Sequence, residues 1–293
     1  MAFNPYIPRR ARVTVTVTRG NAPQTYVWTE QRMRISVRNG GRQFGNAKLE
    51  IFGLRLDTMN QIARLWLEAL APQTSDSVMI ETLDVNGNFT PFFQGIITWS
   101  AVDASAMPQV KLVIEANSSF ALMNAPASPY ANIGPVLIKS VLTSLAAEGD
   151  FALDYADTLP QYQASDLRLV GSPMDQINAL MRGYPDLTFF TNLQRVVVRK
   201  AMAPISADTI RIAPDTGLQS NPVYATSGLT FSTLFNPELR PGVALNINSI
   251  FDFVNRTLWV AAVLAHEIEP NLPGGKWHTS VAANSFGPNG NDQ

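Results

Sequence analysis

The chain has 293 residues and carries 22 Lys and Arg against 23 Asp and Glu, which gives a formal net charge of −1. It contains no cysteine, which excludes a disulfide scaffold, a thiolate metal site and a cysteine nucleophile. The balanced charge excludes a general attraction to phosphate backbones or anionic lipid, and the length predicts two or three packed units.

A low content of charge is the unusual feature of the composition. Charged residues make up 15% of the chain, whereas about 25% is ordinary for a soluble domain. One interpretation is an assembly that hides much of its surface against other chains, because the centres of protein interfaces are depleted in charge. The other interpretation is a large core under a neutral polar surface.

Residues 1–118 are predicted to be rich in β-strands. Alternation of apolar and polar residues with high strand propensity favours strands over residues 11–18, 25–29, 33–37, 48–52, 77–83, 92–102 and 109–116. A helix capped by Asp57 is predicted to carry Met59, Ile62, Trp66, Leu67 and Leu70 on its apolar face. The pair Asn86-Gly87 predicts a hairpin turn. Six or seven strands around one helix suggest a barrel or a sandwich.

Charge is distributed unevenly along the chain. Residues 1–118 carry 12 basic and 9 acidic side chains, whereas residues 204–293 carry 4 basic and 7 acidic ones. One interpretation pairs the basic part with an acidic surface on a partner or on the next copy of the chain. The alternative is an ordinary solvated face.

Residues 119–203 are predicted to form a small α+β unit. Pro135 is placed in the first turn of a helix whose apolar stripe continues to Leu145 and ends at Gly149. A second helix is predicted to begin with Ser172 as its cap and Pro173 as its first residue. Residues 187–191 and 195–200 are then predicted to form a hairpin.

Residues 204–293 return to strands, which are predicted over 229–234, 243–250, 257–268 and 276–283. Within the third strand, residues 258–265 are apolar on both alternating faces, which predicts a strand covered on both sides. This run is too short to span a membrane, for which about 20 residues are needed. The tail over 284–293 is expected to be disordered.

The chain is poor in groups that would build a catalytic or metal site. His266 begins a sequence like the zinc-binding helix motif, but Pro270 stands where that motif needs its second histidine. The acidic residues Asp150, Asp154, Asp157 and Asp166 are interpreted as a loop rim rather than as paired carboxylates for glycoside hydrolysis. The aromatic residues Phe89, Phe92 and Phe93 are interpreted as core rather than as a platform for nucleic-acid bases. No catalytic residue, cofactor site or metal site is therefore predicted, and the chain is not expected to be an enzyme.

Two blocks of residues resemble bacteriophage tail baseplate hub proteins. The C-terminal block contains, in order, Pro241-Gly242, Asn246, Asn248, Asn255-Arg256, His266, Pro273-Gly274-Gly275 and Trp277-His278-Thr279. The N-terminal block runs from Asn46 to Leu54 and is followed by the predicted helix from Asp57, which resembles the strand–helix junction of tail-tube-type barrels.

The resemblance implies a β-rich α+β fold with two tail-tube-like β-barrel domains, at residues 1–118 and 204–293, and a small α+β domain between them, at 119–203. It further implies a homotrimer that joins a sixfold tail tube to a threefold spike, within the tail baseplate of a virion assembled in the host cytoplasm. The expected partners are tail tube or distal tail proteins, the central spike protein, other baseplate proteins and passing DNA, which is not bound sequence-specifically. No membrane insertion and no cofactor are expected.

Two other functions remain open from the sequence. The same architecture would serve as the hub portion of a type VI or other contractile injection device. A carbohydrate-binding or glycan-hydrolysing β-protein would instead need exposed aromatic residues over a cleft and, for hydrolysis, two facing carboxylates.

Overall fold

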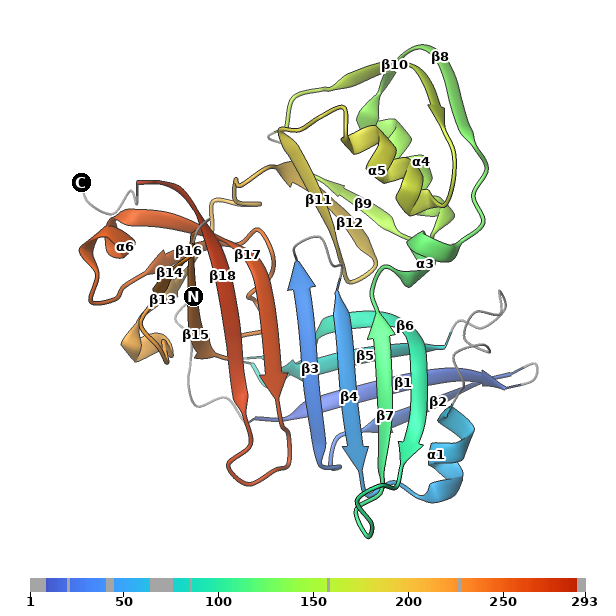
Figure 1. Cartoon of the computed structure of the whole chain (residues 1–293), viewed down its shortest axis with the longest axis vertical. Helices are drawn as coiled ribbons and strands as arrows, with labels where there is room; N and C mark the ends of the chain where they lie inside the picture. Colours follow the sequence, from blue (N-terminus) through green and yellow to red (C-terminus); the bar gives the residue numbers. More distant parts are fainter. Residues whose placement is uncertain are drawn as a thin grey trace.

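The computed structural model describes residues 9–19, 22–40, 45–63, 76–84, 86–156, 159–225 and 228–288. Figure 1 shows two groups of strands side by side, with a mixed unit of helices and strands above them. Among the helices of these residues, none has the length and apolar character needed to cross a membrane.

The first group corresponds to the strand-rich N-terminal part of the sequence. Its elements are β1 (Ala11–Arg19), β2 (Ala22–Trp28), β3 (Met33–Gly40), β4 (Asn46–Phe52), α1 (Leu56–Ile62), β5 (Ser77–Leu83), β6 (Phe89–Asp103) and β7 (Lys111–Asn117). The predicted strands of this region are all present. Helix α1 begins at Leu56 with Arg55 in the cap position, so the prediction of Asp57 as the cap is wrong. Its predicted continuation through Trp66, Leu67 and Leu70 lies outside the described residues.

The long strand β6 folds the first group back on itself. Its first half pairs with β5 and its second half with β7, and a β-bulge separates Ile97 from Trp99. Because a bulge bends the strand that carries it, β5, β1 and β2 cross behind β3, β4 and β7 (Figure 1). The apolar face of β1, formed by Val13, Val15 and Val17, is completely buried between these layers, as the alternation predicts.

The middle unit has a hydrophobic core of its own. Its elements are α3 (Phe120–Asn124), β8 (Tyr130–Leu137), α4 (Ile138–Glu148), β9 (Ala152–Tyr155), β10 (Gln163–Leu169), α5 (Pro173–Met181), β11 (Leu187–Asn192) and β12 (Arg195–Lys200). Helices α4 and α5 pack against each other, α4 contacts β8 and β9, and α5 contacts β10. The strands form a two-stranded sheet, β10–β8, and a three-stranded sheet, β11–β12–β9.

The two helix starts predicted in this unit have different outcomes. The cap at Ser172 is confirmed, because its Oγ accepts the Asp175 N–H at 3.2 Å and the Asp175 carboxylate accepts the Ser172 N–H at 3.1 Å. The start at Pro135 is wrong, because Pro135 lies in β8 opposite Ser165 of β10 and α4 begins three residues later, at Ile138. A two-stranded sheet has only edge strands, which tolerate proline.

The second group of strands follows the middle unit. Its elements are β13 (Thr209–Ile212), the 3-10 helix η1 (Pro214–Thr216), β14 (Val223–Ala225), β15 (Gly228–Leu234), β16 (Ala244–Ile247), α6 (Asp252–Arg256), β17 (Thr257–Ile268) and β18 (Trp277–Pro288). The four predicted strands are present. The expectation of disorder from Asn284 is wrong up to Pro288, because β18 pairs with β17 along its whole length. Residues 289–293 lie outside the described part.

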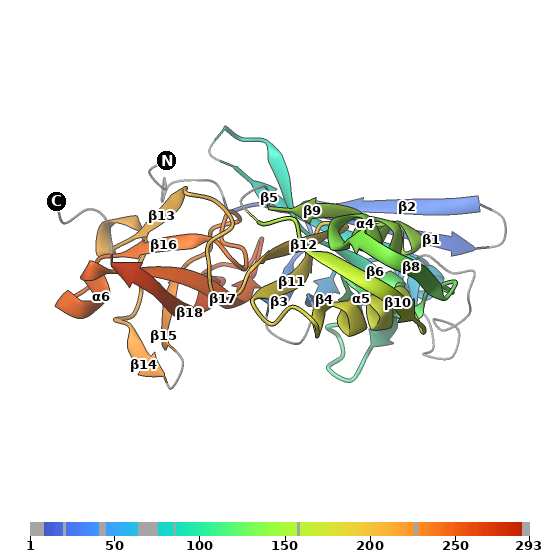
Figure 2. The ribbon, with the colours of Figure 1, turned by 90° about the horizontal axis from the view of Figure 1, so that it is seen from above.

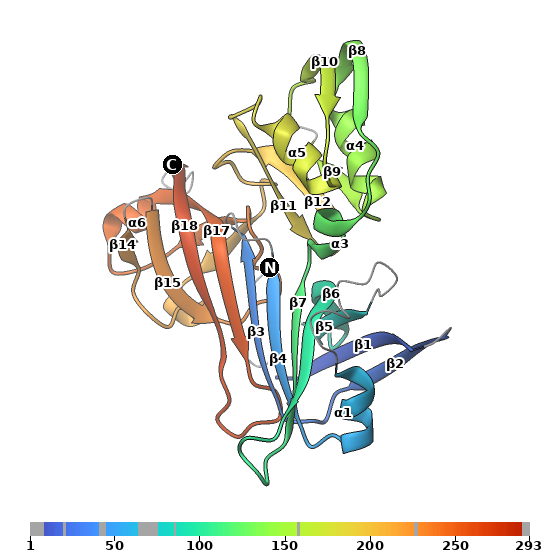
Figure 3. The same cartoon turned by 45° about the vertical axis from the view of Figure 1, so that its right-hand side comes forward.

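A direct strand pairing joins the two groups. Strand β17 pairs with β3 in antiparallel register, from Val263 opposite Gly40 to Ile268 opposite Ile35, which produces one 13-stranded sheet. Figure 2 shows the two groups side by side from above, and Figure 3 shows β17 and β3 adjacent from a second direction. Phe235 and Trp277 of the second group also belong to the core of the first group.

The two groups share one strand order. The sheet runs β3-β4-β7-β6-β5-β1 in the first group and β14-β15-β18-β17-β16, then β13, in the second. The long strand of each group carries a bulge, after Ile97 in β6 and after Ala261 in β17. The groups differ where β13 pairs with β16 in parallel, since β1 pairs with β5 antiparallel. Each group therefore contains the same arrangement of a four-stranded wall and a strand that turns away behind it.

Candidate functional site

One face of the joined sheet is polar over strands β18, β17, β3, β4 and β7. Along β3, Met33, Ile35 and Val37 are buried, and the alternate residues from Arg34 to Arg38 face away from the core. Strand β4 repeats this pattern, with Leu49 and Ile51 buried. Because side chains alternate along a strand, the outward residues of neighbouring strands meet on one surface.

The strand register places opposite charges beside each other on this surface. Arg34 lies opposite Glu50, and Lys48 lies opposite Glu115. The Nζ atom of Lys48 is 3.3 Å from the Glu115 carboxylate. Opposite charges directly across a strand pair stabilise a sheet modestly.

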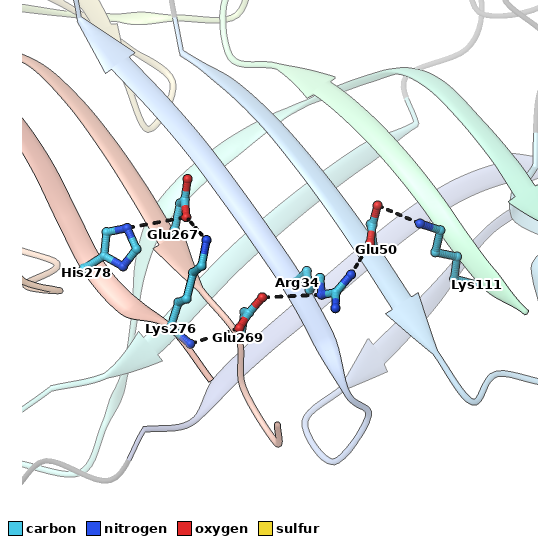
Figure 4. A network of polar contacts seen from close by, with 7 residues as sticks. All are labelled: Arg34, Glu50, Lys111, Glu267, Glu269, Lys276 and His278. Atoms are coloured by element: carbon cyan, nitrogen blue, oxygen red, sulfur yellow. Dashed lines mark hydrogen bonds and ion pairs between the residues drawn. The ribbon is translucent and has the colours of Figure 1, made fainter. Parts of the chain in front are cut away.

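Figure 4 shows the part of this network that β17 and β18 contribute. The Nζ atom of Lys276 donates to the Glu267 carboxylate at 3.0 Å, and Nε2 of His278 lies 3.4 Å from the same carboxylate. The backbone N–H of Lys276 donates to the Glu269 carboxylate, also at 3.0 Å. These contacts close the turn between β17 and β18.

Arg34 connects this cluster to the first group of strands (Figure 4). Its Nε is 3.4 Å from the Glu269 carboxylate, and its Nη1 is 3.7 Å from the Glu50 carboxylate. Lys111 continues the network, with Nζ at 2.9 Å from Glu50 and 3.5 Å from Asp103. A continuous series of ion pairs therefore crosses the junction between the two groups.

Hydrogen bonds and ion pairs shift the pKa values of Lys111, Lys276 and Asp103. The hydrogen bond that Lys111 donates to Glu50 raises the pKa of the lysine, and the bond from Lys276 to Glu267 raises the pKa of Lys276. The pKa of Asp103 is lowered, mainly by hydrogen bonds from Ser105 and less by Lys111. Each of these three shifts favours the charged form of its side chain.

Basic and acidic side chains nearly balance on this surface, which we call the charged face. Its basic residues are Arg32, Arg34, Arg38, Lys48, Lys111 and Lys276, and its acidic residues are Glu50, Asp103, Glu115, Glu267 and Glu269. A polyanion is held electrostatically by an excess of cations, and the charged face offers almost none.

A depression over β15, β18 and β17 adjoins the charged face, and Arg38 is the charged residue among those that line it. Its volume is about 560 Å³, and small or apolar side chains line most of it, including Thr230, Ser232, Val263, Ala265, Ser280 and Ala282. The expectation that β17 is covered on both sides holds over Trp259, Val260 and Ala261, which are consecutive and all buried. It does not hold farther along the strand, where Val263 and Ala265 are only half-buried.

His266 lies on the core side of β17, away from the charged face. It is 2% exposed, and its Nδ1 is 2.9 Å from the Thr279 hydroxyl of β18. The rings of Phe92 and Phe235 meet it edge-on, at centroid distances of 5.9 and 5.4 Å. Burial lowers the pKa of His266 from 6.5 to about 4, so the ring is neutral around pH 7. Within the described ranges, no group of three or more His, Asp or Glu is arranged to hold a metal ion.

The acidic residues considered for catalysis are placed on different elements. Asp154 lies in β9 of the three-stranded sheet, and Asp166 lies in β10 of the two-stranded sheet, where its carboxylate accepts the Gly134 N–H at 3.1 Å. Asp150 follows α4, and Asp157 lies outside the described residues.

Two of the three aromatic residues of β6 that were predicted to be core lie in the core, and Phe89 does not. Phe92 and Phe93 are 6% and 2% exposed, which confirms them as core. Phe89 is half-buried, and the guanidinium of Arg12 lies 4.5 Å from its ring centroid.

Sequence reasoning found the strands that carry the charged face but none of its residues. The available signal was the charge at alternate positions, as in Arg34 and Arg38 or Lys48 and Glu50. That alternation identifies an outward face. It carries no information on which strand of the second group will pair with β3.

The sequence matches no protein-family model and no curated protein. Solved structures do match. The tail protein from Neisseria meningitidis MC58 aligns with a TM-score of 0.59 at 10% identity, over 94% of this chain and 96% of that one. The 43 kDa tail protein of prophage MuSo2 from Shewanella oneidensis aligns with a TM-score of 0.61 at 6% identity, over 92% and 97%. The chain has the fold of phage tail proteins.

A third similar structure comes from a secretion system. It is an E. coli protein described as a component of the type VI secretion system with structural similarity to T4 bacteriophage tail proteins. It aligns with a TM-score of 0.58 at 9% identity, over 87% of this chain and 73% of that one. The resemblance to tail hub proteins seen in the sequence is thus confirmed at the level of the fold.

Replacing Arg34 with methionine is expected to lower the free energy of unfolding by at most about 1 kcal/mol. The side chain is 57% exposed, so solvent weakens both of its ion pairs. Urea unfolding at low and high salt would measure the loss, which should shrink as salt screens the pairs. Arg55→Met is the matched control, because Arg55 is 85% exposed and its ion pair within the described residues is a local one, with Asp57 at 3.7 Å. An Arg34 loss that does not depend on salt would contradict the electrostatic explanation.

Proposed function

We propose that this chain is a structural virion protein, the central baseplate hub of a phage tail. Three copies form a ring in which each contributes two strand walls, so that threefold symmetry presents six similar units. One side of the ring meets the sixfold tail tube or distal tail proteins, and the other meets a threefold central spike. The ring is assembled in the host cytoplasm and ends in the virion baseplate.

The shared strand order of the two groups is the observation that carries this proposal. The order β3-β4-β7-β6-β5 recurs as β14-β15-β18-β17-β16, and the pairing of β17 with β3 sets the two walls side by side in one sheet. Three such chains in closed symmetry supply six walls without six separate proteins. The fold shared with phage tail proteins supports the same conclusion.

We place the charged face on the channel of this ring, where DNA passes without sequence-specific binding. Its near balance of charge supports this placement, because a strongly basic lining would retain a polyanion through its phosphates. The proposed domains are a first tube-like domain at 1–118, an α+β domain at 119–203 outside the tube and a second tube-like domain at 204–293. The function is structural and needs no catalytic residue.

Light scattering coupled to size exclusion tests the proposal directly. The expected mass is three times the 32.1 kDa of the chain, and electron microscopy down the axis should show a ring with six similar lobes and a central hole. A strict monomer at micromolar concentration, or a ring with another number of lobes, would contradict the proposed hub.

The second candidate is the hub portion of a type VI or other contractile injection device. The fold similarity to the E. coli type VI component favours it. Both functions use the same ring, so the neighbouring genes decide between them: capsid and terminase genes indicate a phage, and effector and immunity genes indicate secretion.

A further inference from the structure

The strand walls end at two edges that differ in sequence. One edge is β14, the last strand on the side of the second group. The other is the second half of β6, where Trp99 to Asp103 pairs with β7 on one side. In the part of the chain that the structure describes, no strand pairs with the other side of this half. Unpaired strand edges are templates for pairing with another chain.

Strand β17 shows what such an edge binds. It begins by pairing with β16, bulges after Ala261, and then pairs with β3 on the side opposite β18. Strand β6 begins by pairing with β5 and bulges after Ile97. The edge of β17 that pairs with β3 therefore corresponds to the edge of β6 that has no partner strand within the described residues.

The repeat also identifies the counterpart of β3. We aligned the two groups by the registers of their strand pairs. In this alignment β14 is equivalent to β3, and Tyr224 is equivalent to Val37. The neighbouring positions agree in burial, since Leu229 and its equivalent Ala47 are 1% and 4% exposed. Val37 is 0% exposed because it packs into the core, whereas Tyr224 is 53% exposed.

Tyr224 belongs to an apolar patch at this edge. Its ring lies 6.1 Å from that of Phe251 and 6.4 Å from that of Phe253, measured between centroids. Phe253 is 60% exposed and Phe251 is 36% exposed. Contiguous exposed apolar side chains of this kind mark interaction sites.

We propose that β14 of one copy pairs antiparallel with the second half of β6 of the next copy, as β3 pairs with β17 within the chain. The register follows from the repeat: Ala101 faces Ala225, Val102 faces Tyr224 and Asp103 faces Val223 of the next copy. The inference rests on the proposed ring and names the strands that close it. In the closed ring, the charged face continues from one copy to the next without an open edge.

Three properties of the chain favour a second copy as the partner of the β6 edge. The two edges are different, so their contact is head-to-tail, and a head-to-tail contact that closes forms a ring. The part that carries β6 has 12 basic and 9 acidic residues, whereas the part that carries β14 has 4 and 7. The two parts of the chain therefore carry net charges of opposite sign, +3 and −3, which favours their contact. The β3–β17 junction shows that the same backbone geometry is already formed once in each chain.

Engineered cysteines test the pairing without background, because the chain has no cysteine. The double variants Val102→Cys/Tyr224→Cys and Ala101→Cys/Ala225→Cys are oxidised and run on non-reducing gels. Facing positions in adjacent strands approach within disulfide reach, and we expect covalent dimers and trimers from at least one of the two pairs. The control is Thr25→Cys/Tyr224→Cys, which reports instead on pairing of β14 with the outer strand β2.

Light scattering of the wild-type chain shows whether a negative cross-linking result overturns the strand pairing alone or the proposed trimer as well. A trimer with cross-links only at the β6 positions supports the inference. A trimer with no cross-link, or with cross-links only through β2, overturns the inference and leaves the proposed hub standing. A monomer overturns both.

A matched pair of charge substitutions gives an independent test. Tyr224→Asp places a carboxylate where the next copy should pack and is expected to convert the trimer to monomers, with little change in the thermal unfolding of the monomer. Val27→Asp is the control, because Val27 is 55% exposed, close to the 53% of Tyr224, and lies on β2. A Tyr224→Asp variant that remains trimeric would overturn the proposed edge.

Discussion

Replacing Gly40 with alanine is expected to lower the free energy of unfolding by about 3 kcal/mol. Gly40 has φ of +92°, and a Cβ atom there would lie 2.1 Å from the carbonyl oxygen of Ala262 in β17. The positive φ and the close approach of the Ala262 carbonyl oxygen both involve the backbone, so rotation of a side chain cannot relieve either of them. Because Gly40 pairs with Val263 at the end of the β3–β17 ladder, the junction between the two strand groups must open or shift.

Gly53→Ala isolates the steric part of this effect. Gly53 also has a positive φ, +76°, but nothing lies within 4 Å of the Cβ position. Its substitution should therefore cost only the backbone strain, roughly 1–2 kcal/mol. Urea unfolding of the two variants measures the difference. Equal losses at Gly40 and Gly53 would show that the close approach of β17 contributes nothing.

The local elements of this fold are largely predictable from the sequence. Val13, Val15 and Val17 alternate with threonine and are all completely buried, because a strand with one covered face imposes a period of two. Ser172, Pro173 and Asp175 predict the start of α5 through the hydrogen bonds that the structure contains. Such signals depend on residues that are close in sequence, so they can be interpreted without knowledge of the tertiary structure.

The helix start at Pro135 shows where local signals fail. Proline suits both the first turn of a helix and an edge strand. The apolar residues after it continue directly into α4, so the helical spacing extends back over Leu137. The pairing of β8 with β10, from a separate part of the middle unit, decides the outcome.

The charged face could not be assembled from the sequence. Its ion pairs from Arg34 to Glu269 and from Arg34 to Glu50 require β17 and β4 on either side of β3. The first neighbour comes from the opposite end of the chain, and its register is set by tertiary packing. The likeness of the two groups was expected only from the family resemblance. The residues themselves do not reveal it, because the groups share positions and burial rather than residues: Lys48 of β4 corresponds to Thr230 of β15.

Acidification is expected to destabilise the protein through His266. The buried ring has a pKa of about 4, compared with 6.5 for an exposed histidine. Between these values the unfolded chain binds a proton that the folded chain does not, so stability falls as the pH decreases from 6.5 towards 4. The difference between the two pKa values corresponds to about 3 kcal/mol once the pH is below both.

His266→Gln removes this titration and retains a polar group beside the Thr279 hydroxyl. The variant should be less stable than the wild type at pH 7, because glutamine fills the space between Phe92 and Phe235 poorly. The difference in the free energy of unfolding between the wild type and the variant should be smaller at pH 4.5, since only the wild type loses the contribution of the histidine. Guanidinium unfolding of both proteins at pH 7 and pH 4.5 measures this difference at each pH.

His278→Gln is the matched control for the pH dependence. It removes the other histidine of the chain, whose side chain is 25% exposed beside Glu267, and leaves the buried ring in place. We expect this variant to lose as much stability as the wild type between pH 7 and pH 4.5. If His266→Gln instead lost as much as the wild type, the carboxylates and not the buried imidazole would account for acid sensitivity. His266 would then be only a packing residue between the two groups of strands.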